Sequence, residues 1–136
     1  MIHVLHEPYG PLFDKWHLNH IDWPSPALPD DCRPVIHRLD VDTGAPHDHP
    51  WGFHTFCLRG GYEEEVFHRL ENGLWTVRHR QHRPGEARYV PAGHIHRVTR
   101  LLDGPCFTCV LYGPQEREWR YYPEALGALQ PIGEAA

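Results

Sequence analysis

The stretch GAPHDHPWGFHTFCLRGG, residues 44–61, places His47, His49 and His54 in one short segment that ends on two glycines. Residues two apart in an extended strand lie on the same face, about 7 Å apart along the backbone. We therefore expect His47 and His49 to direct their imidazoles at one point. Because imidazole is the commonest protein ligand of metal ions, the pair predicts part of a metal site.

The rest of this segment predicts an inward orientation for the third histidine. Residues 50–52 are expected to turn the chain, after which the sequence is typical of a strand. His54 shares its parity with Phe56 and Leu58, two apolar residues that we expect to face the core. His54 is therefore predicted to join the other two histidines as a metal ligand. The alternative is a core or mouth histidine beside a site of three histidines.

A second segment supplies the last expected ligand. Residues 85–98, GEARYVPAGHIHRV, contain a turn at Gly85 and another at residues 91–93 before His96 enters a strand. A histidine from a strand distant in sequence would complete a metal site inside a barrel. His94 has the same parity as His96 but sits in the turn, so we expect it at the rim of the cavity.

Length and composition predict one all-β domain. A chain of 136 residues fits a single compact unit, and 14 prolines and 12 glycines interrupt it too often for long helices. We expect one domain over residues 1–136: an N-terminal wrap over 1–32, a barrel core over about 33–122, and a tail over 123–136 with a short helix and a frayed end. The expected strands cover residues 34–41, 54–60, 62–70, 74–82, 86–91, 96–102, 106–112 and 117–122.

Two features in the middle of the chain predict local structure. Asn72 and Gly73 are the strongest hairpin signal, because both residue types accept the positive φ of a type I′ turn. The acidic run of Glu63, Glu64 and Glu65 is interpreted as a solvated strand end.

Charge and hydropathy exclude several classes of function. A formal net charge of -5 argues against sequence-independent binding to nucleic acid phosphates. No apolar run approaches the length of a membrane span, and the start of the chain lacks the basic and apolar regions of a cleaved leader. We therefore expect a cytoplasmic protein whose partner is a small molecule, and neither a nucleic acid nor a membrane.

The cysteines are predicted to be reduced and structural. Cys106 and Cys109 read as C-x-x-C, but the segment around them is β-branched and aromatic. In a strand, residues three apart point to opposite faces, so we expect neither a shared metal nor a disulfide between these two cysteines.

The two histidine segments together resemble the two sequence motifs of the cupin family. The first cupin motif begins G-x5-H-x-H and ends on glycine, and His47, His49 and Gly61 match it. The second motif reads G-x5-P-x-G-x2-H-x3-N, and its glycines, proline and histidine match residues 85–96 without a gap. The resemblance implies an antiparallel double-stranded β-helix, or jelly-roll barrel, that binds a divalent metal. Cupins often pair as dimers, so a homodimer is also expected.

Two departures from the cupin motifs bear on the chemistry. His54 stands where most metal cupins have glutamate, and a neutral ligand there leaves the ion its full charge, which favours Fe(II), Zn, Ni or Cu over Mg or Ca. Arg100 stands where the second motif has asparagine, and it shares the parity of His96 and Val98. We expect Arg100 to point into the cavity and bind a substrate carboxylate. The predicted metal ligands are His47, His49, His54 and His96.

A further similarity, to thiol dioxygenases, concerns three short matches. These enzymes also carry HDH, HRV and a downstream LY, which here are residues 47–49, 96–98 and 111–112. The similarity implies a dioxygenase, with Tyr112 assisting catalysis, and the charge of the metal predicts a small, anionic organic substrate. Val110 stands where these enzymes have a histidine, and the chain has no good match for their upstream substrate-binding arginine. The alternative is a non-catalytic small-molecule-binding cupin, or a non-redox isomerase or epimerase.

Overall fold

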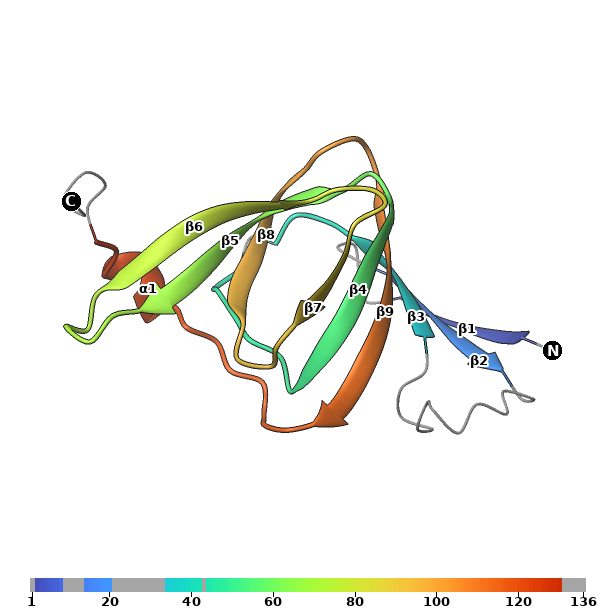
Figure 1. Cartoon of the computed structure of the whole chain (residues 1–136), viewed down its shortest axis with the longest axis horizontal. Helices are drawn as coiled ribbons and strands as arrows, with labels where there is room; N and C mark the ends of the chain where they lie inside the picture. The colour runs from blue at the N-terminus through green and yellow to red at the C-terminus, as the bar shows by residue number, and fades with distance from the viewer. Residues whose placement is uncertain (1, 9–13, 21–33, 43, 131–136) are drawn as a thin grey trace.

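The structure, a computed structural model, describes residues 2–8, 14–20, 34–42 and 44–130 (Figure 1). Nearly all regular structure in these ranges is β-strand, and the strands pair antiparallel, so the predicted all-β antiparallel fold is confirmed. The elements are β1 (Ile2–Pro8), β2 (Asp14–His20), β3 (Pro34–Leu39), β4 (Trp51–Arg59), β5 (Tyr62–Arg69), β6 (Trp75–His82), β7 (Ala87–Val90), β8 (Ile95–Leu101), β9 (Cys106–Gln115) and α1 (Glu124–Gly127).

The strands form two sheets that curve around a common interior (Figure 1). One sheet has the order β1-β2-β3-β9-β4-β7, and the other has the order β6-β5-β8. The connection from β3 to β4 runs beside β8, because the Asp42 N–H donates to the Val98 carbonyl (2.7 Å) and His47 forms an antiparallel bridge with His96. This connection therefore extends the second sheet and carries residues 46–50, which we call the H-D-H segment after His47, Asp48 and His49.

The chain passes from the first sheet to the second at a pair of glycines between β4 and β5. Gly60 has a φ of 83° and Gly61 a φ of 80°, in the left-handed region that favours glycine. A Cβ atom on Gly60 would also collide with the carbonyl group of Pro105. Glycine therefore permits the abrupt change of direction that brings β5 into the other sheet.

The hairpin predicted at Asn72 and Gly73 is present, but its turn type is not the predicted one. Gly73 has a φ of 85°, whereas no non-glycine residue in the described ranges has a positive φ. Asn72 therefore does not meet the requirement of a type I′ turn. Its side chain instead accepts a hydrogen bond from the Leu74 N–H (3.0 Å), and the turn closes through the Leu70 N–H and the Leu74 carbonyl (2.7 Å).

Apolar clusters lie at the closed end of the barrel and beneath α1, while many buried side chains elsewhere are polar. At the closed end, where β4 leads into β5, the cluster contains Cys57, Tyr62, Val98 and Cys106. Phe67, Trp75 and Ala125 pack α1 against the second sheet.

Many of the buried side chains outside these clusters are polar. Burying a polar group costs free energy unless the group is paired, so this number of buried polar side chains marks the interior as a candidate site. They are His37, Asp48, Thr55, Glu64, His82, His96 and Thr108.

The strand expected over residues 117–122 is absent, and β1 and β2 were not predicted. Residues 117–122 form no regular strand, because their backbone bonds mainly to the H-D-H segment, where Tyr121 makes an isolated bridge with His47. Residues 1–32, expected as a wrap, contribute β1 and β2 beside β3, and the rest of this wrap lies outside the described residues, as does the end of the tail. The expected short helix is α1. No helix in the described ranges has the length and apolar character to cross a membrane.

Candidate metal centre

Three histidines meet at the end of the barrel opposite the closed end. His47 and His49 come from the connection beside β8, and His96 comes from β8 itself. Their ring centroids are 5.3 Å apart for His47 and His49, 5.1 Å for His47 and His96, and 4.9 Å for His49 and His96. One ring nitrogen of each lies within 4.8 Å of the others. Two nitrogens on one transition-metal ion are at most about 4.2 Å apart, so a small adjustment brings all three to one ion.

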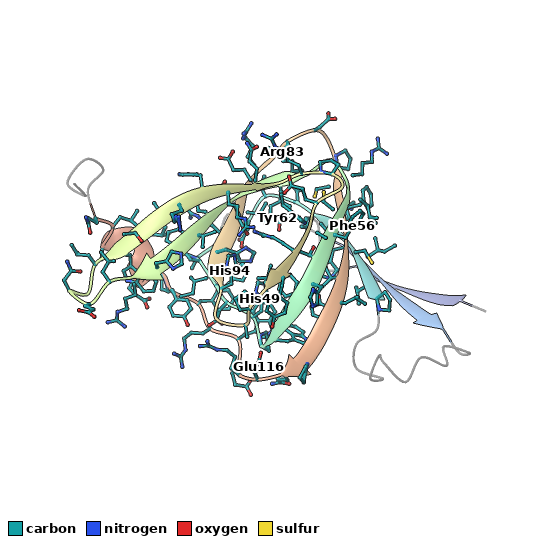
Figure 2. All side chains as sticks on the ribbon, viewed as in Figure 1. His49, Phe56, Tyr62, Arg83, His94 and Glu116 are labelled. Carbon is teal, nitrogen blue, oxygen red and sulfur yellow. The ribbon has the colours of Figure 1, made fainter. Side chains whose placement is uncertain are left out.

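Backbone pairing holds these histidines together. The His47 N–H donates to the His96 carbonyl (3.0 Å), and the His96 N–H donates to the His47 carbonyl (2.9 Å). The expectation that His96 comes from a distant strand to meet His47 and His49 is therefore confirmed. Figure 2 shows His49 among the side chains at this end of the barrel, with His94 nearby.

The hydrogen bonds of the three rings leave nitrogens available for a metal. The His47 Nδ1 lies 3.3 Å from the Asp42 carboxylate, and the His96 Nδ1 hydrogen-bonds with the Glu64 carboxylate. The His96 Nε2 and the His49 Nδ1 are buried and have no hydrogen-bond partner in the described part of the chain. Because unpaired buried nitrogens are costly, this donor set fits a divalent transition metal that would satisfy them.

Glu64 lies behind the centre, and sequence reasoning missed it. The prediction of a solvated strand end is wrong for Glu64, because alternation along β5 places it with Tyr62 and Val66 on the inner face, fully buried. Besides His96, its carboxylate lies 2.7 Å from the Arg88 Nη2 and 3.4 Å from the His94 Nε2. The sequence did indicate that Glu64 is buried, because the residues two positions away on either side, Tyr62 and Val66, are apolar.

Burial and neighbouring charges set the protonation states. Burial alone would raise the pKa of Glu64, but hydrogen bonds with His94 and His96 and the charge of Arg88 hold it well below its usual range. Burial, followed by the neighbouring histidines, lowers the pKa of His49 to about 2. Burial also lowers the pKa of His96, against the effect of Glu64. His49 and His96 are therefore neutral at physiological pH, the form that binds metal.

A second group of potential ligands, Glu64, His94 and His96, adjoins the first. The Arg88 guanidinium already contacts the Glu64 carboxylate, and its positive charge opposes a cation there. Glu64 is better suited to accept the Nδ1–H of His96, because such a carboxylate orients a ligating imidazole and makes it more basic. The geometry therefore favours a metal on His47, His49 and His96.

His54 does not join the three histidines. His54, Phe56 and Leu58 lie on the outer face of β4, and Phe56 and Leu58 are 41% and 47% exposed, whereas Thr55 and Cys57 are buried. The shared parity was predicted correctly, but the inward orientation is wrong. The apolar residues that indicated the core face cover the outside of the sheet, and polar Thr55 faces the interior.

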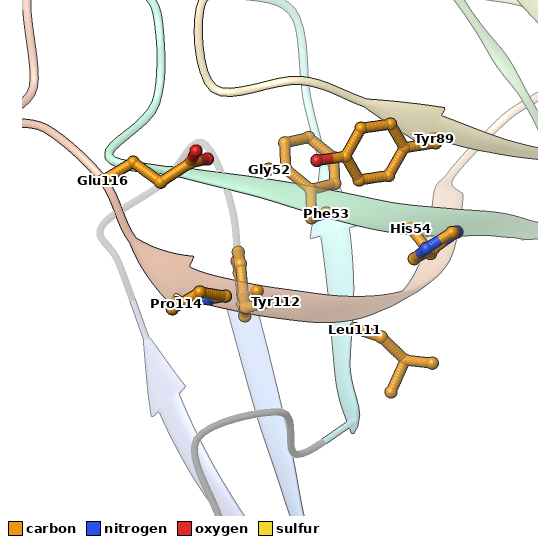
Figure 3. A pocket seen from close by; sticks show the side chains of 9 residues that line it. Gly52, Phe53, His54, Tyr89, Leu111, Tyr112, Pro114 and Glu116 are labelled. Atoms are coloured by element: carbon orange, nitrogen blue, oxygen red, sulfur yellow. The ribbon is translucent and has the colours of Figure 1, made fainter. Parts of the chain in front are cut away.

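His54 and Tyr112 instead both line a pocket of about 240 Å³ at the irregularity in β4 (Figure 3). The His54 ring lies 4.9 Å from the ring of Tyr89, centroid to centroid. The pocket is lined by Gly52, Phe53, His54, Tyr89, Leu111, Tyr112, Gly113, Pro114 and Glu116.

Arg100 lies on the surface. Its Nη2 donates to the Glu63 carboxylate (2.8 Å), and its side chain is 59% exposed. The predicted inward orientation is wrong because the pairing of β5 and β8 contains a bulge. Glu64 pairs with Val98 and Glu63 with Arg100, so Thr99 is an extra residue that reverses the alternation.

Arg88, on β7, enters the barrel. Its side chain is 8% exposed, and its Nη2 donates to the Tyr62 hydroxyl (2.9 Å) and contacts Glu64. Its Nε and Nη1 are buried with no hydrogen-bond partner among the described residues. These donors suit a carboxylate in the interior. Its parity with buried Val90 was the signal that sequence reasoning overlooked.

Tyr112 lies near the centre, at the same end of the barrel. Its hydroxyl and the His37 Nε2 share a hydrogen bond of 2.8 Å, and its ring stacks on Trp51 with centroids 4.6 Å apart. The Phe53 ring lies 6.0 Å from Tyr112 and 5.1 Å from His49. Phe53 thus links Tyr112 to the histidines, and the catalytic role of Tyr112 stays a prediction.

The sequence matches no protein-family model and no curated protein, but solved structures share the fold. KdgF from Halomonas sp. aligns with a TM-score of 0.53 and 18% identity over 82% of this chain and 89% of that one. A cupin 2 conserved barrel domain protein from Rhodopseudomonas palustris aligns with a TM-score of 0.57 and 15% identity over 93% and 81%. Fe(II)-HppE aligns with a TM-score of 0.53 and 12% identity over 82% and 56%. At these identities the likeness concerns the fold alone.

Proposed function

We propose that this chain, a small domain with the cupin fold, is a metalloenzyme that carries out a dioxygenase-type reaction on a small anionic organic substrate. A divalent transition metal would be held by His47, His49 and His96. The observation that carries the proposal is the meeting of three imidazoles at one end of the barrel, two of them with a buried nitrogen that lacks a partner in the described residues. An all-nitrogen donor set suits Fe(II), Zn or Ni and disfavours Mg and Ca.

Three protein ligands leave coordination positions open, as a catalytic metal requires. A bound Fe(II) would supply the redox chemistry of a dioxygenase, and HppE, similar in fold, was solved with Fe(II). Glu64 accepts the Nδ1–H of His96 and so keeps the Nε2 of that ring deprotonated and directed at the ion. The burial of His49 and His96 keeps protons from competing for their ring nitrogens.

Charge supports an anionic substrate. Neutral imidazole ligands would leave a divalent ion with its full charge, and the unpartnered nitrogens of Arg88 add donors inside the barrel. Arg88 takes the role that the sequence suggested for Arg100. Tyr112, paired with His37, is our candidate for carrying a proton to or from the substrate.

Metal content and oxygen consumption test this function. Elemental analysis should find about one transition-metal ion per chain, and His49→Ala should lose it while His54→Ala, altered on the outer face, retains it. With Fe(II), the wild-type protein should consume oxygen with members of a panel of small carboxylates, with and without a thiol, and not with the matching amides.

The two parts of the proposal can fail separately. A protein that takes up no transition metal would contradict the metal centre. A loaded protein that consumes no oxygen with any panel member would contradict the dioxygenase reaction. That result would favour a small-molecule-binding protein or a non-redox isomerase.

A further inference from the structure

Residues 117–122, which we call the strap, connect β9 to α1 and pass along the end of the barrel that holds the histidines (Figure 1). The strap bonds along its length to the H-D-H segment. The Tyr122 N–H donates to the Pro46 carbonyl (2.7 Å), and the Asp48 N–H donates to the Arg120 carbonyl (3.0 Å). The strap and the ligand segment are therefore one hydrogen-bonded unit.

Asp48, between the two histidines of the H-D-H segment, fastens the strap. Its fully buried carboxylate accepts hydrogen bonds from the Arg120 N–H (3.0 Å) and the Tyr122 hydroxyl (2.8 Å), and lies 3.0 Å from the Arg117 Nη2. All three partners belong to the strap. Because adjacent residues of an extended segment point in opposite directions, an Asp48 that points into the strap directs the histidines on either side toward the barrel.

The strap brings Trp119 against those histidines. Its ring lies 5.1 Å from the ring of His49, 5.8 Å from that of His47 and 5.8 Å from that of Trp51, centroid to centroid. Trp119 is 46% exposed, so part of the indole packs on the imidazoles while the rest faces solvent. A large rigid ring therefore occupies space beside His47 and His49, two of the candidate metal ligands.

We propose, on the premise of the metal centre above, that Trp119 is a specificity-determining residue that forms one wall of the site and excludes bulky ligands. Asp48 is a positioning residue, which acts by holding the strap and hence the indole in place. A compact ligand fits beside Trp119, whereas a ligand with an aromatic substituent meets the indole.

Binding of two probe ligands to the cobalt-loaded protein tests the wall. Imidazole and 4-phenylimidazole are titrated separately while the visible spectrum of Co(II) is recorded. Trp119→Ala should improve the affinity for 4-phenylimidazole by about tenfold or more while changing that for imidazole by less than about twofold, because only the larger probe meets the wall. The matched control is Leu126→Ala, a partly exposed residue of α1, which should leave both affinities unchanged.

A second measurement tests Asp48 without any metal. Asp48→Asn weakens the contacts with the strap, so trypsin should cut the metal-free variant after Arg117 or Arg120 faster than it cuts the wild-type protein, with cutting after exposed Arg59, at the turn between β4 and β5, as the internal control. The cobalt-loaded variant should show the same relaxed selectivity as Trp119→Ala. If Asp48→Asn does not fold, Tyr122→Phe, which removes one hydrogen bond to the same carboxylate, provides the milder test.

The outcomes separate the two proposals. Cobalt binding with unchanged selectivity in Trp119→Ala would overturn the wall and leave the metal centre intact. Faster cutting of Asp48→Asn with unchanged selectivity would overturn the positioning role of Asp48. A wild-type protein that binds no cobalt would overturn the metal centre and, with it, the wall.

Discussion

The two ends of the barrel are built by the same strands but hold different side chains. At the closed end, Val98 packs with Tyr62, Cys57 and Cys106 in an apolar cluster. Two residues earlier along β8, on the same inner face, His96 belongs to the candidate metal centre. Two neighbouring inward-facing residues of one strand thus differ in role: Val98 stabilises the fold by packing, and His96 is available for chemistry.

The same physical cause has opposite consequences at the two ends. Burial disfavours the charged form of any group. At the closed end it raises the pKa of Cys106 to about 12 and also raises that of Cys57, so both thiols stay protonated and are poor ligands and nucleophiles. At the histidine end it keeps His49 and His96 neutral, which is the form that binds metal.

The largest difference between the ends is expected from His49→Ala and Tyr62→Ala. His49→Ala removes one of three ligands and should weaken zinc binding by more than about 100-fold. It should change the free energy of unfolding of the metal-free protein by less than about 2 kcal/mol, because the lost ring has an unpaired buried nitrogen. Tyr62→Ala should lower the free energy of unfolding by about 3–5 kcal/mol, because it empties a packed site. Competition titration measures the zinc affinity, and urea unfolding with chelator measures the stability. A large loss of stability in His49→Ala together with a large loss of zinc affinity in Tyr62→Ala would contradict this difference between the two ends.

Glu64→Gln tests the same comparison at a residue that lies between the two ends of the barrel. Loss of the carboxylate that accepts the His96 N–H should weaken zinc binding by about 10–100-fold. The matched control is Glu63→Gln, one residue away on the outer face, where the partner is exposed Arg100, and its zinc affinity should not change. Equal losses in both variants would show that net charge, and not the contact with His96, explains the effect.

The barrel and the meeting of three histidines could be predicted because their signals are local. Proline, glycine and alternating residues mark most of the strands, and the H-x-H spacing places His47 and His49 on one face. The pairing with His96 required only that two segments meet inside a barrel. Those predictions are confirmed by the bridge between His47 and His96.

The remaining features depend on pairing between strands, which the sequence does not display. A bulge at Thr99 turns Arg100 outward, and only the register of β5 and β8 shows it. Glu64 and Arg88 are buried because each neutralises the other across the interior. Alternation with apolar neighbours indicated the inner face for each residue, but a single charged residue there is costly unless it is paired, and the pairing of the two is what the sequence does not display.

The closed end should also respond to acid through His82. Burial, then the charge of Arg88, lowers the pKa of His82 to about 4, below the value of about 6.5 for a free histidine. The unfolded chain therefore binds more protons between these values, so stability is at its full value above about pH 6.5 and falls as the pH approaches 4. His82→Phe should make this decline in urea midpoints, measured with chelator, less steep, while buried His49 and His96 keep part of it. His79→Phe, exposed on the same strand, should retain it, and an equal slope in both variants would contradict the assignment.

The smallest effect is expected at His54, on the outer face of β4. His54→Ala should change zinc affinity by less than about twofold and the free energy of unfolding by less than about 0.5 kcal/mol, because the ring is exposed. Zinc titration and urea unfolding measure both.

A tenfold or larger loss of zinc affinity would mean that β4 presents its other face to the interior. That face could turn inward only if the pairing of β4 with β7 and β9 shifted by one residue, which would carry Thr55 outward and Phe56 inward. The apolar parity of Phe56 and Leu58 makes that alternative the one the sequence favours. A single zinc titration of His54→Ala therefore tests both the register of β4 and the limit of the ligand set to three histidines.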